Sequence, residues 1–131
     1  MPEPAHTPGR KPLVLVVDDH PDIRLICAKA LEQAGYRTVT AGSGDEALAA
    51  LAAGVPDLIV LDLMMPGMDG FTTAHLLRER SETAHTPIIV LTAAPAAREQ
   101  AAYRVGAQAF CVKPVEARRL VALARRLCPL G

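Results

Sequence analysis

The sequence has few aromatic residues, no net charge and no long apolar run. It contains no Trp, two Phe and two Tyr among 131 residues, so the core must consist mainly of aliphatic side chains. Fourteen basic residues balance fourteen acidic ones, and nothing in the charge indicates binding to nucleic acid or to an anionic membrane. No apolar stretch approaches the roughly 18 residues of a membrane-spanning helix, and the chain starts with no signal peptide. We therefore expect one cytoplasmic domain without a membrane partner.

Cysteine and histidine are also scarce. The three cysteines (Cys27, Cys111 and Cys128) are odd in number, far apart and without CxxC spacing, so we expect buried free thiols in a reducing compartment. The four histidines share no metal-ligand spacing with these cysteines, which argues against a zinc site.

Five short apolar runs, bounded by turn residues, alternate with segments in which apolar residues recur at helical spacing. A Pro-rich stretch over residues 1–12 has no periodicity and predicts a disordered leader before a domain over 13–128. Asp69 is placed to cap the third helix, and Gly35 to end the first. The predicted strands are residues 13–17, 36–40, 58–61, 87–91 and 109–112; the predicted helices are about 21–34, 43–53, 71–80, 95–105 and 115–127.

This alternation predicts right-handed crossovers and a parallel sheet with helices on both faces. For five strands we expect the flavodoxin-like, doubly wound α/β fold with strand order 2-1-3-4-5. Ligands of such folds bind outside the carboxyl ends of the strands, so the residues that follow each strand are the first candidates for a site.

Polar residues follow four of the five predicted strands. Asp18 and Asp19 follow the first strand, Asp62 the third, Thr92 the fourth and Lys113 the fifth. Taken singly, an acidic pair is typical of a helix cap, and a Lys or Thr at a strand end is usually solvated. Parallel strands bring all of these residues to one edge of the sheet, and a cluster of complementary titratable groups favours a functional site.

Three neighbouring carboxylates repel one another, so either their pKa values rise or a cation lies among them. Oxygen ligands of this kind suit Mg²⁺, which shares its other positions with water and phosphate. Asp62 then serves as a nucleophile that forms an aspartyl phosphate, while Lys113 and the Thr92 hydroxyl stabilise the phosphoryl oxygens.

These motifs, taken together, resemble the receiver domain of two-component response regulators over about residues 12–128. The resemblance implies that Asp62 accepts a phosphoryl group from a phosphohistidine on a sensor histidine kinase or a phosphotransfer protein. It implies a regulatory phosphoacceptor that promotes its own phosphorylation and dephosphorylation, and not a conventional enzyme. The matching segments are Leu15 to Asp19, Asp62 with Met65 to Gly70, Leu91 to Ala93, and Gly106-Ala107 leading to Lys113-Pro114.

The resemblance also implies roles for further residues. Mg²⁺ is bound by Asp19, Asp62 and the backbone carbonyl of Met64, with Asp18 acting partly through water. Lys113 pairs with the phosphoryl group, next to a cis peptide bond before Pro114.

In receivers a Thr and an aromatic residue act as a switch, here Thr92 and Phe110, although Phe110 also suits a plain core position. The switch alters a surface formed by residues 95–105, 109–112 and 115–127, which is read by a downstream protein target or a fused output domain. Met64 and Ala94 border the route of the attacking water and cannot orient it by hydrogen bonding, so we expect a long-lived phosphoryl group.

The same residues argue against two other functions, a phosphatase and a cofactor-binding module. A dehalogenase-type phosphatase needs a second Asp two residues after its nucleophile, where Met64 stands. A flavodoxin-like cofactor module needs a Gly- or Ser/Thr-rich loop after the first strand to bind phosphate. Asp18 and Asp19 stand there instead, and their negative charges repel phosphate. A phosphorylation-independent α/β interaction module remains the alternative. The sequence leaves open the kinase, the output, and whether the domain is free-standing, a monomer or a weak homodimer.

Overall fold

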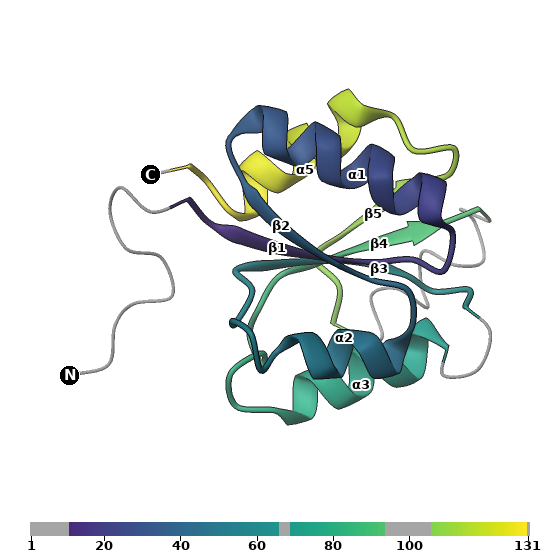
Figure 1. Ribbon diagram of the computed structural model, residues 1–131, viewed down its shortest axis with the longest axis vertical. Helices are drawn as coiled ribbons and strands as arrows, with labels where there is room; N and C mark the ends of the chain where they lie inside the picture. The colour runs from purple at the N-terminus through teal and green to yellow at the C-terminus, as the bar shows by residue number, and fades with distance from the viewer. Residues whose placement is uncertain (1–10, 66–68, 94–105, 131) are drawn as a thin grey trace.

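The computed structural model describes residues 11–65, 69–93 and 106–130. Within them, five parallel strands form one sheet in the order β2-β1-β3-β4-β5, as predicted (Figure 1). The sheet is parallel throughout, so the carboxyl ends of all its strands lie along one edge. The strands are β1 (Leu13–Val17), β2 (Arg37–Ala41), β3 (Leu58–Asp62), β4 (Ile88–Thr92) and β5 (Ala109–Val112).

Helices cover both faces of this sheet. Figure 1 shows α1 (Pro21–Ala34) and α5 (Ala117–Leu127) on one face, and α2 (Gly44–Ala50) and α3 (Gly70–Glu79) on the other. The predicted helix over 95–105 lies outside the described residues. No helix among the described residues has the length and apolarity needed to cross a membrane.

The core consists of two aliphatic layers, one on each face of the sheet. Side chains alternate along the strands because successive residues of a strand point to opposite faces. In β1, for example, Leu15 and Val17 pack toward α2 and α3, whereas Val14 and Val16 pack toward α1 and α5. The three cysteines are free and buried, as expected.

Several element boundaries differ from the prediction by a residue or more. β2 begins after Tyr36, whose ring is buried and whose hydroxyl donates to the Cys128 carbonyl at 2.7 Å. β4 begins after Pro87, which has no N–H to donate to a sheet. The regular part of α2 ends at Ala50, and residues 51–54 continue as tighter turns with hydrogen bonds to the third residue back.

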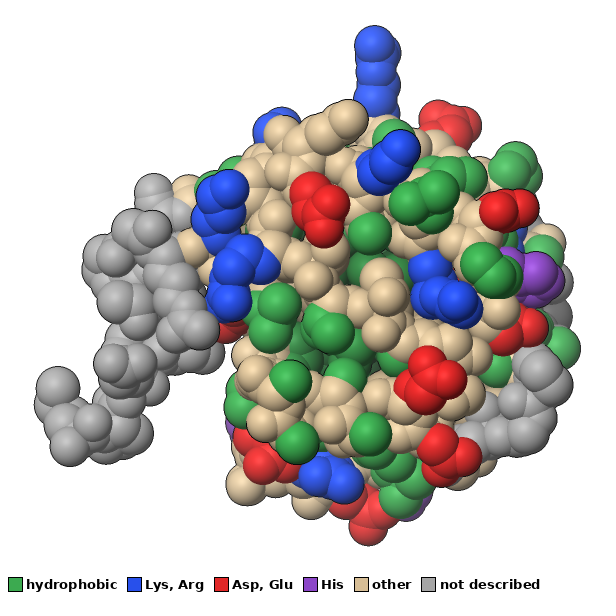
Figure 2. Space-filling model, in the orientation of Figure 1, with side chains coloured by type: hydrophobic (Ala, Val, Ile, Leu, Met, Phe, Trp, Pro, Cys, Tyr) green, Lys and Arg blue, Asp and Glu red, His purple; other side chains and the backbone are tan. Residues whose placement is uncertain are grey.

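Charged groups of both signs are interspersed on the face of the molecule seen in Figure 2. Figure 2 shows acidic and basic side chains distributed over the visible face with apolar groups between them. This mixture agrees with the formal net charge of zero. Local chemistry at the sheet edge, and not a large single-sign field, therefore distinguishes the candidate site.

Candidate functional site

The carboxyl ends of β1, β3 and β5 bring two buried carboxylates and one ammonium group together. Asp18 is 0% exposed and Asp62 is 1% exposed. The Lys113 Nζ atom lies 3.0 Å from Asp18 Oδ2 and 3.3 Å from Asp62 Oδ2. One lysine thus bridges two acids that are 44 residues apart in the sequence and meet only because β1 and β3 are neighbours.

Backbone groups hold the carboxylates in place. The Met64 N–H donates to Asp62 Oδ1 at 3.0 Å, and the His20 N–H donates to Asp18 Oδ1 at 2.9 Å. Arg24 reaches back from α1 and donates to the Asp18 carbonyl at 2.7 Å. Each acid therefore has one oxygen fixed by the turn that follows its strand, and the other directed toward Lys113.

Burial and neighbouring charges shift the pKa of the central acid. Burial raises the pKa of Asp62, and the adjacent Asp18 charge raises it further, against the opposing effects of the Met64 N–H and Lys113. Burial lowers the pKa of Lys113, but its hydrogen bonds and charge interactions with Asp18 and Asp62 outweigh burial, so its pKa is raised overall. Lys113 accordingly stays a cation.

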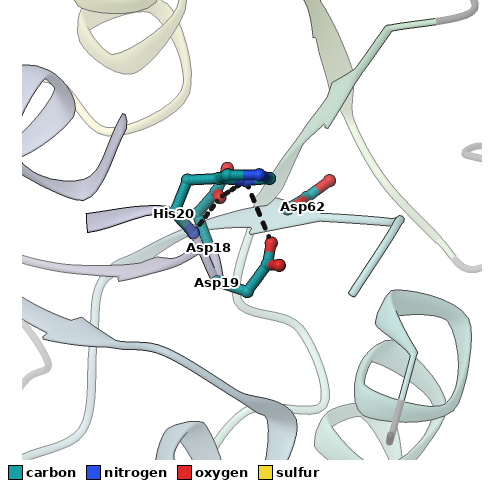
Figure 3. Close-up of side chains that lie close together, drawn as sticks. All are labelled: Asp18, Asp19, His20 and Asp62. Atoms are coloured by element: carbon teal, nitrogen blue, oxygen red, sulfur yellow. Dashed lines mark hydrogen bonds and ion pairs between the residues drawn. The ribbon is translucent and has the colours of Figure 1, made fainter. Parts of the chain in front are cut away.

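The third acid of the site, Asp19, adds a further negative charge. Its side chain is 24% exposed and lies beside Asp18 (Figure 3). Lys113 pairs with Asp18 and Asp62, and Asp19 adds a third carboxylate beside them. Three buried oxygens, Asp18 Oδ2, Asp19 Oδ1 and Asp62 Oδ2, accept no hydrogen bond within the described residues beyond their ion pairs with Lys113 and His20. A divalent cation with oxygen ligands fits this set, since such ions bind where carboxylates converge.

A histidine completes the cluster. His20 follows the acidic pair, and Figure 3 shows its ring beside Asp18 and Asp19, with Asp62 across from them. One ligand atom from each of Asp18, Asp19, His20 and Asp62 lies within 4.8 Å of the others. The prediction did not include His20, because its spacing matches no known histidine and cysteine pattern; its position next to two acids was the available signal.

The two predicted switch residues lie on neighbouring strands. Thr92 ends β4, is 1% exposed, and its carbonyl accepts a hydrogen bond from the Lys113 N–H at 2.8 Å. Phe110, on β5, is half-buried and packs against the core layer beneath α2 and α3. The peptide bond between Lys113 and Pro114 is cis, as the resemblance implied.

Gly70, which ends the matching segment Met65 to Gly70, is a further residue of the site. Its N–H donates to the Leu63 carbonyl at 3.1 Å. A Cβ atom at this position would collide with the Asp62 carbonyl oxygen and the Leu63 Cα. The start of α3 therefore packs directly against the backbone that carries Asp62, which requires glycine.

Comparison with known proteins gives consistent results. Residues 14–125 match the family described as the response regulator receiver domain. The response regulator PleD of Caulobacter vibrioides is 40% identical over 116 residues, which cover 87% of this chain and 25% of PleD. The probable transcriptional regulator ycf27 of Cyanophora paradoxa is 41% identical over 118 residues, or 89% of this chain and 48% of ycf27. The chain thus spans half or less of the length of these relatives.

Solved structures resemble the whole described domain. The chemotaxis protein CheY4 of Vibrio cholerae is similar with a TM-score of 0.85 and 35% sequence identity. The similarity covers 90% of this chain and 99% of the CheY4 chain.

Proposed function

The chain belongs to the response regulator receiver domain family, and from that premise we propose that it is a phosphoacceptor domain whose acceptor is Asp62. The observation that carries the proposal is the buried Asp62 carboxylate, which ends the central strand β3 and shares Lys113 with Asp18. We take the domain to span residues 13–128 and to act in the cytoplasm.

The proposed donor is a phosphohistidine on a sensor histidine kinase or a phosphotransfer protein. An Asp62 carboxylate oxygen attacks the phosphorus atom and forms an O–P bond. The P–N bond to the donor imidazole breaks, and its electron pair remains on the imidazole nitrogen. The product is an aspartyl phosphate in the chain and a free histidine in the donor.

Lys113 has a distinct task before and after the transfer. Before it, the ammonium group neutralises Asp18 and Asp62 and keeps the raised pKa of Asp62 from rising further. After it, one Asp62 oxygen is bonded to phosphorus in a mixed anhydride, and the same ammonium pairs with a phosphoryl oxygen. The Thr92 hydroxyl, from the end of β4, donates to another phosphoryl oxygen.

Asp18, Asp19, Asp62 and the Met64 carbonyl are the proposed holders of Mg²⁺. When bound, this ion supplies charge neutralisation for the phosphoryl oxygens. Support for it comes from three buried carboxylate oxygens that accept no hydrogen bond within the described residues beyond their ion pairs, and from the close approach of the acids that carry them. Asp18 and Asp62 are fixed by backbone donors, so the protein itself orients the ligands before an ion arrives.

The proposed output is a change of surface that another protein or a fused domain reads. Thr92 moves toward the phosphoryl group, and the Phe110 ring follows it toward the core. The surface affected consists of residues 95–105, β5 and α5, and of these the first segment lies outside the described residues. We propose a monomer or weak homodimer that does not itself contact nucleic acid. A phosphorylation-independent interaction module is not favoured, since it gives no reason for a buried cluster of acids around Lys113.

Intact-protein mass tests the proposal most directly. The protein is incubated with a small acyl phosphate or phosphoramidate, with Mg²⁺ or with a chelator, as wild type and as Asp62→Asn. We expect one added phosphoryl group in the wild type with Mg²⁺, and none in the other samples. Asp45→Asn, which changes an exposed acid at the start of α2, is the matched control and should be modified like the wild type. An adduct that survives Asp62→Asn contradicts the assignment of the acceptor.

A further inference from the structure

The His20 imidazole lies where a metal ligand is expected. Its Nδ1 atom is 3.2 Å from Asp18 Oδ1 and also 3.2 Å from Asp19 Oδ1. Two ligand atoms that bind one ion at about 2.1 Å lie roughly 3.0 Å apart in octahedral geometry and roughly 3.4 Å apart in tetrahedral geometry. The separation of Nδ1 from both carboxylate oxygens, which is that of an ion pair, is also within the range for adjacent ligands of a single ion.

The wider ligand set is nearly as compact. All four ligand atoms, including that of Asp62, lie within 4.8 Å of one another. Opposite ligands of one ion lie about 4.2 Å apart, so the side chains need to move by only about half an ångström to close on it. His20 is 62% exposed, and its N–H already anchors the backbone to Asp18, so the ring can adjust without disturbing the fold.

The chemistry of this ligand set differs from that of carboxylates alone. Carboxylate and carbonyl oxygens suit Mg²⁺ and Mn²⁺, whereas imidazole nitrogen favours ions such as Zn²⁺ and Ni²⁺. The His20 Nδ1 atom lies at the same distance from one oxygen of Asp18 and one oxygen of Asp19. A divalent ion bound among these three atoms would have the nitrogen and both oxygens as ligands.

We propose that His20 is a specificity-determining nitrogen ligand of the cation site, so that this receiver domain binds imidazole-preferring transition-metal ions, represented by Zn²⁺, in addition to Mg²⁺. The inference rests on the cation site of the proposed function and extends it. Mg²⁺ and Zn²⁺ therefore compete for this site, and His20 determines how well Zn²⁺ competes.

Calorimetric titration with Zn²⁺ and, separately, with Mg²⁺ at about pH 8, where imidazole is free to bind metal, tests the proposal. The proteins are the wild type, His20→Ala and Asp19→Asn. His75→Ala is the matched control, because His75 is exposed on α3 and pairs only with Glu79 among the described residues. We expect His20→Ala to weaken Zn²⁺ binding by at least about tenfold and to leave Mg²⁺ binding within about twofold. Asp19→Asn should weaken both ions.

A nitrogen-15 spectrum gives a readout independent of affinity. Saturation with Zn²⁺ should shift the His20 Nδ1 resonance strongly, whereas saturation with Mg²⁺ should not. Equal Zn²⁺ affinity of wild type and His20→Ala, with an unshifted Nδ1 resonance, overturns the inference while leaving the proposed function intact. Equal loss of both ions in His20→Ala also overturns it, since His20 then acts on the acids and not on the metal. Zn²⁺ binding through His20 without any Mg²⁺ binding supports the nitrogen ligand and contradicts the proposed function instead.

Discussion

Asp62 carries its charge where almost no solvent reaches it. The Met64 N–H donates to this carboxylate, and the Lys113 ammonium group pairs with it but is shared with Asp18. The Asp18 carboxylate adds a second negative charge nearby. Burial and Asp18 together raise the pKa of Asp62, so the folded protein holds a proton at this site more strongly than the unfolded chain does. Ionised Asp62 therefore lowers the free energy of unfolding. Functional sites often contain groups whose pKa is perturbed in this way.

Replacing Asp62 by Asn should stabilise the metal-free protein. The unfolding free energy of the wild type falls as pH rises from the ordinary aspartate range through the raised pKa of Asp62, and then stays level. At neutral pH we expect Asp62→Asn to be more stable by on the order of 1 kcal/mol, or about 4 °C in Tm. Thermal unfolding in chelator at several pH values measures this, and the difference should shrink toward acid pH. A variant less stable than wild type at neutral pH contradicts the prediction.

Met64 is expected to set how long the phosphoryl group persists. Its N–H holds Asp62, but its side chain is 54% exposed and offers no hydrogen bond to an attacking water. We predict that Met64→Asn shortens the lifetime of the aspartyl phosphate several-fold, measured by the decay of the mass adduct. Val55→Asn, at an exposed apolar residue outside the site, serves as the control. An unchanged lifetime of the aspartyl phosphate in Met64→Asn would contradict this prediction. The second position, Ala94, lies outside the described residues.

At the scale of elements, α3 is fixed at both of its ends. Its start is capped by Asp69, whose side chain accepts from the Thr72 N–H at 2.8 Å, as predicted. Gly70 then lets the helix approach the Asp62 backbone. Near its other end, Arg78 donates to the carbonyls of Thr86 at 2.6 Å and Gly106 at 2.7 Å. The element that supports the acceptor residue is thus tied to the segments that precede β4 and β5.

Gly70→Ala should be strongly destabilising. The added methyl group overlaps backbone atoms of Asp62 and Leu63, which cannot rotate away as a side chain can. We expect a loss of about 3 kcal/mol and a fall of about 10 °C in Tm, with reduced phosphorylation of whatever protein remains folded. Gly54→Ala is the control, because its methyl group would meet only a Leu13 side-chain carbon. Equal stability of the two variants would show that α3 can shift freely.

Arg78→Met should destabilise the protein by about 2 kcal/mol, because it leaves carbonyls in the turn before β4 and at Gly106 without their donor. Arg78→Lys should recover only part of this, since an ammonium group cannot reach both sides as a guanidinium fork does. Urea denaturation provides the measurement. Arg80→Met, which among the described residues removes an exposed 3.9 Å pair with Glu82, should be nearly neutral. A loss in Arg80→Met as large as that in Arg78→Met would contradict the anchoring role.

On the scale of the whole molecule, the sheet connects the site to global stability. Its central strands are buried on both faces, and the acids of the site extend from those same strands. A ligand that binds only the folded arrangement of these strand ends must stabilise the entire domain. Conversely, the metal-free protein holds three carboxylates close together at the edge of its core.

Mg²⁺ should therefore raise the unfolding temperature in a concentration-dependent way. At a concentration about 100 times its Kd the ion adds about 2.7 kcal/mol to the unfolding free energy. We expect Asp19→Asn to lose most of this effect, because it removes a ligand that is partly solvated and little needed for packing. Asp45→Asn should keep it. A Tm that rises with Mg²⁺ equally in Asp19→Asn would place the binding elsewhere.

The sequence by itself predicted the fold and most of the polar residues that lie at one edge of the sheet. Aliphatic runs of strand length alternating with helical periodicity predict a parallel sheet, and parallel direction alone places Asp18, Asp62, Thr92 and Lys113 on one edge. These conclusions need only local pattern and chirality, which are properties of the chain.

Only the tertiary structure decided how these residues meet. That Lys113 bridges Asp18 and Asp62, that the His20 ring lies equally far from two acids, and that Gly70 lies against the Asp62 carbonyl all depend on how distant elements pack. The same holds for the early end of α2. Sequence spacing carries no record of such contacts, because rotamers and close backbone approaches are selected by neighbours that the chain brings together only on folding.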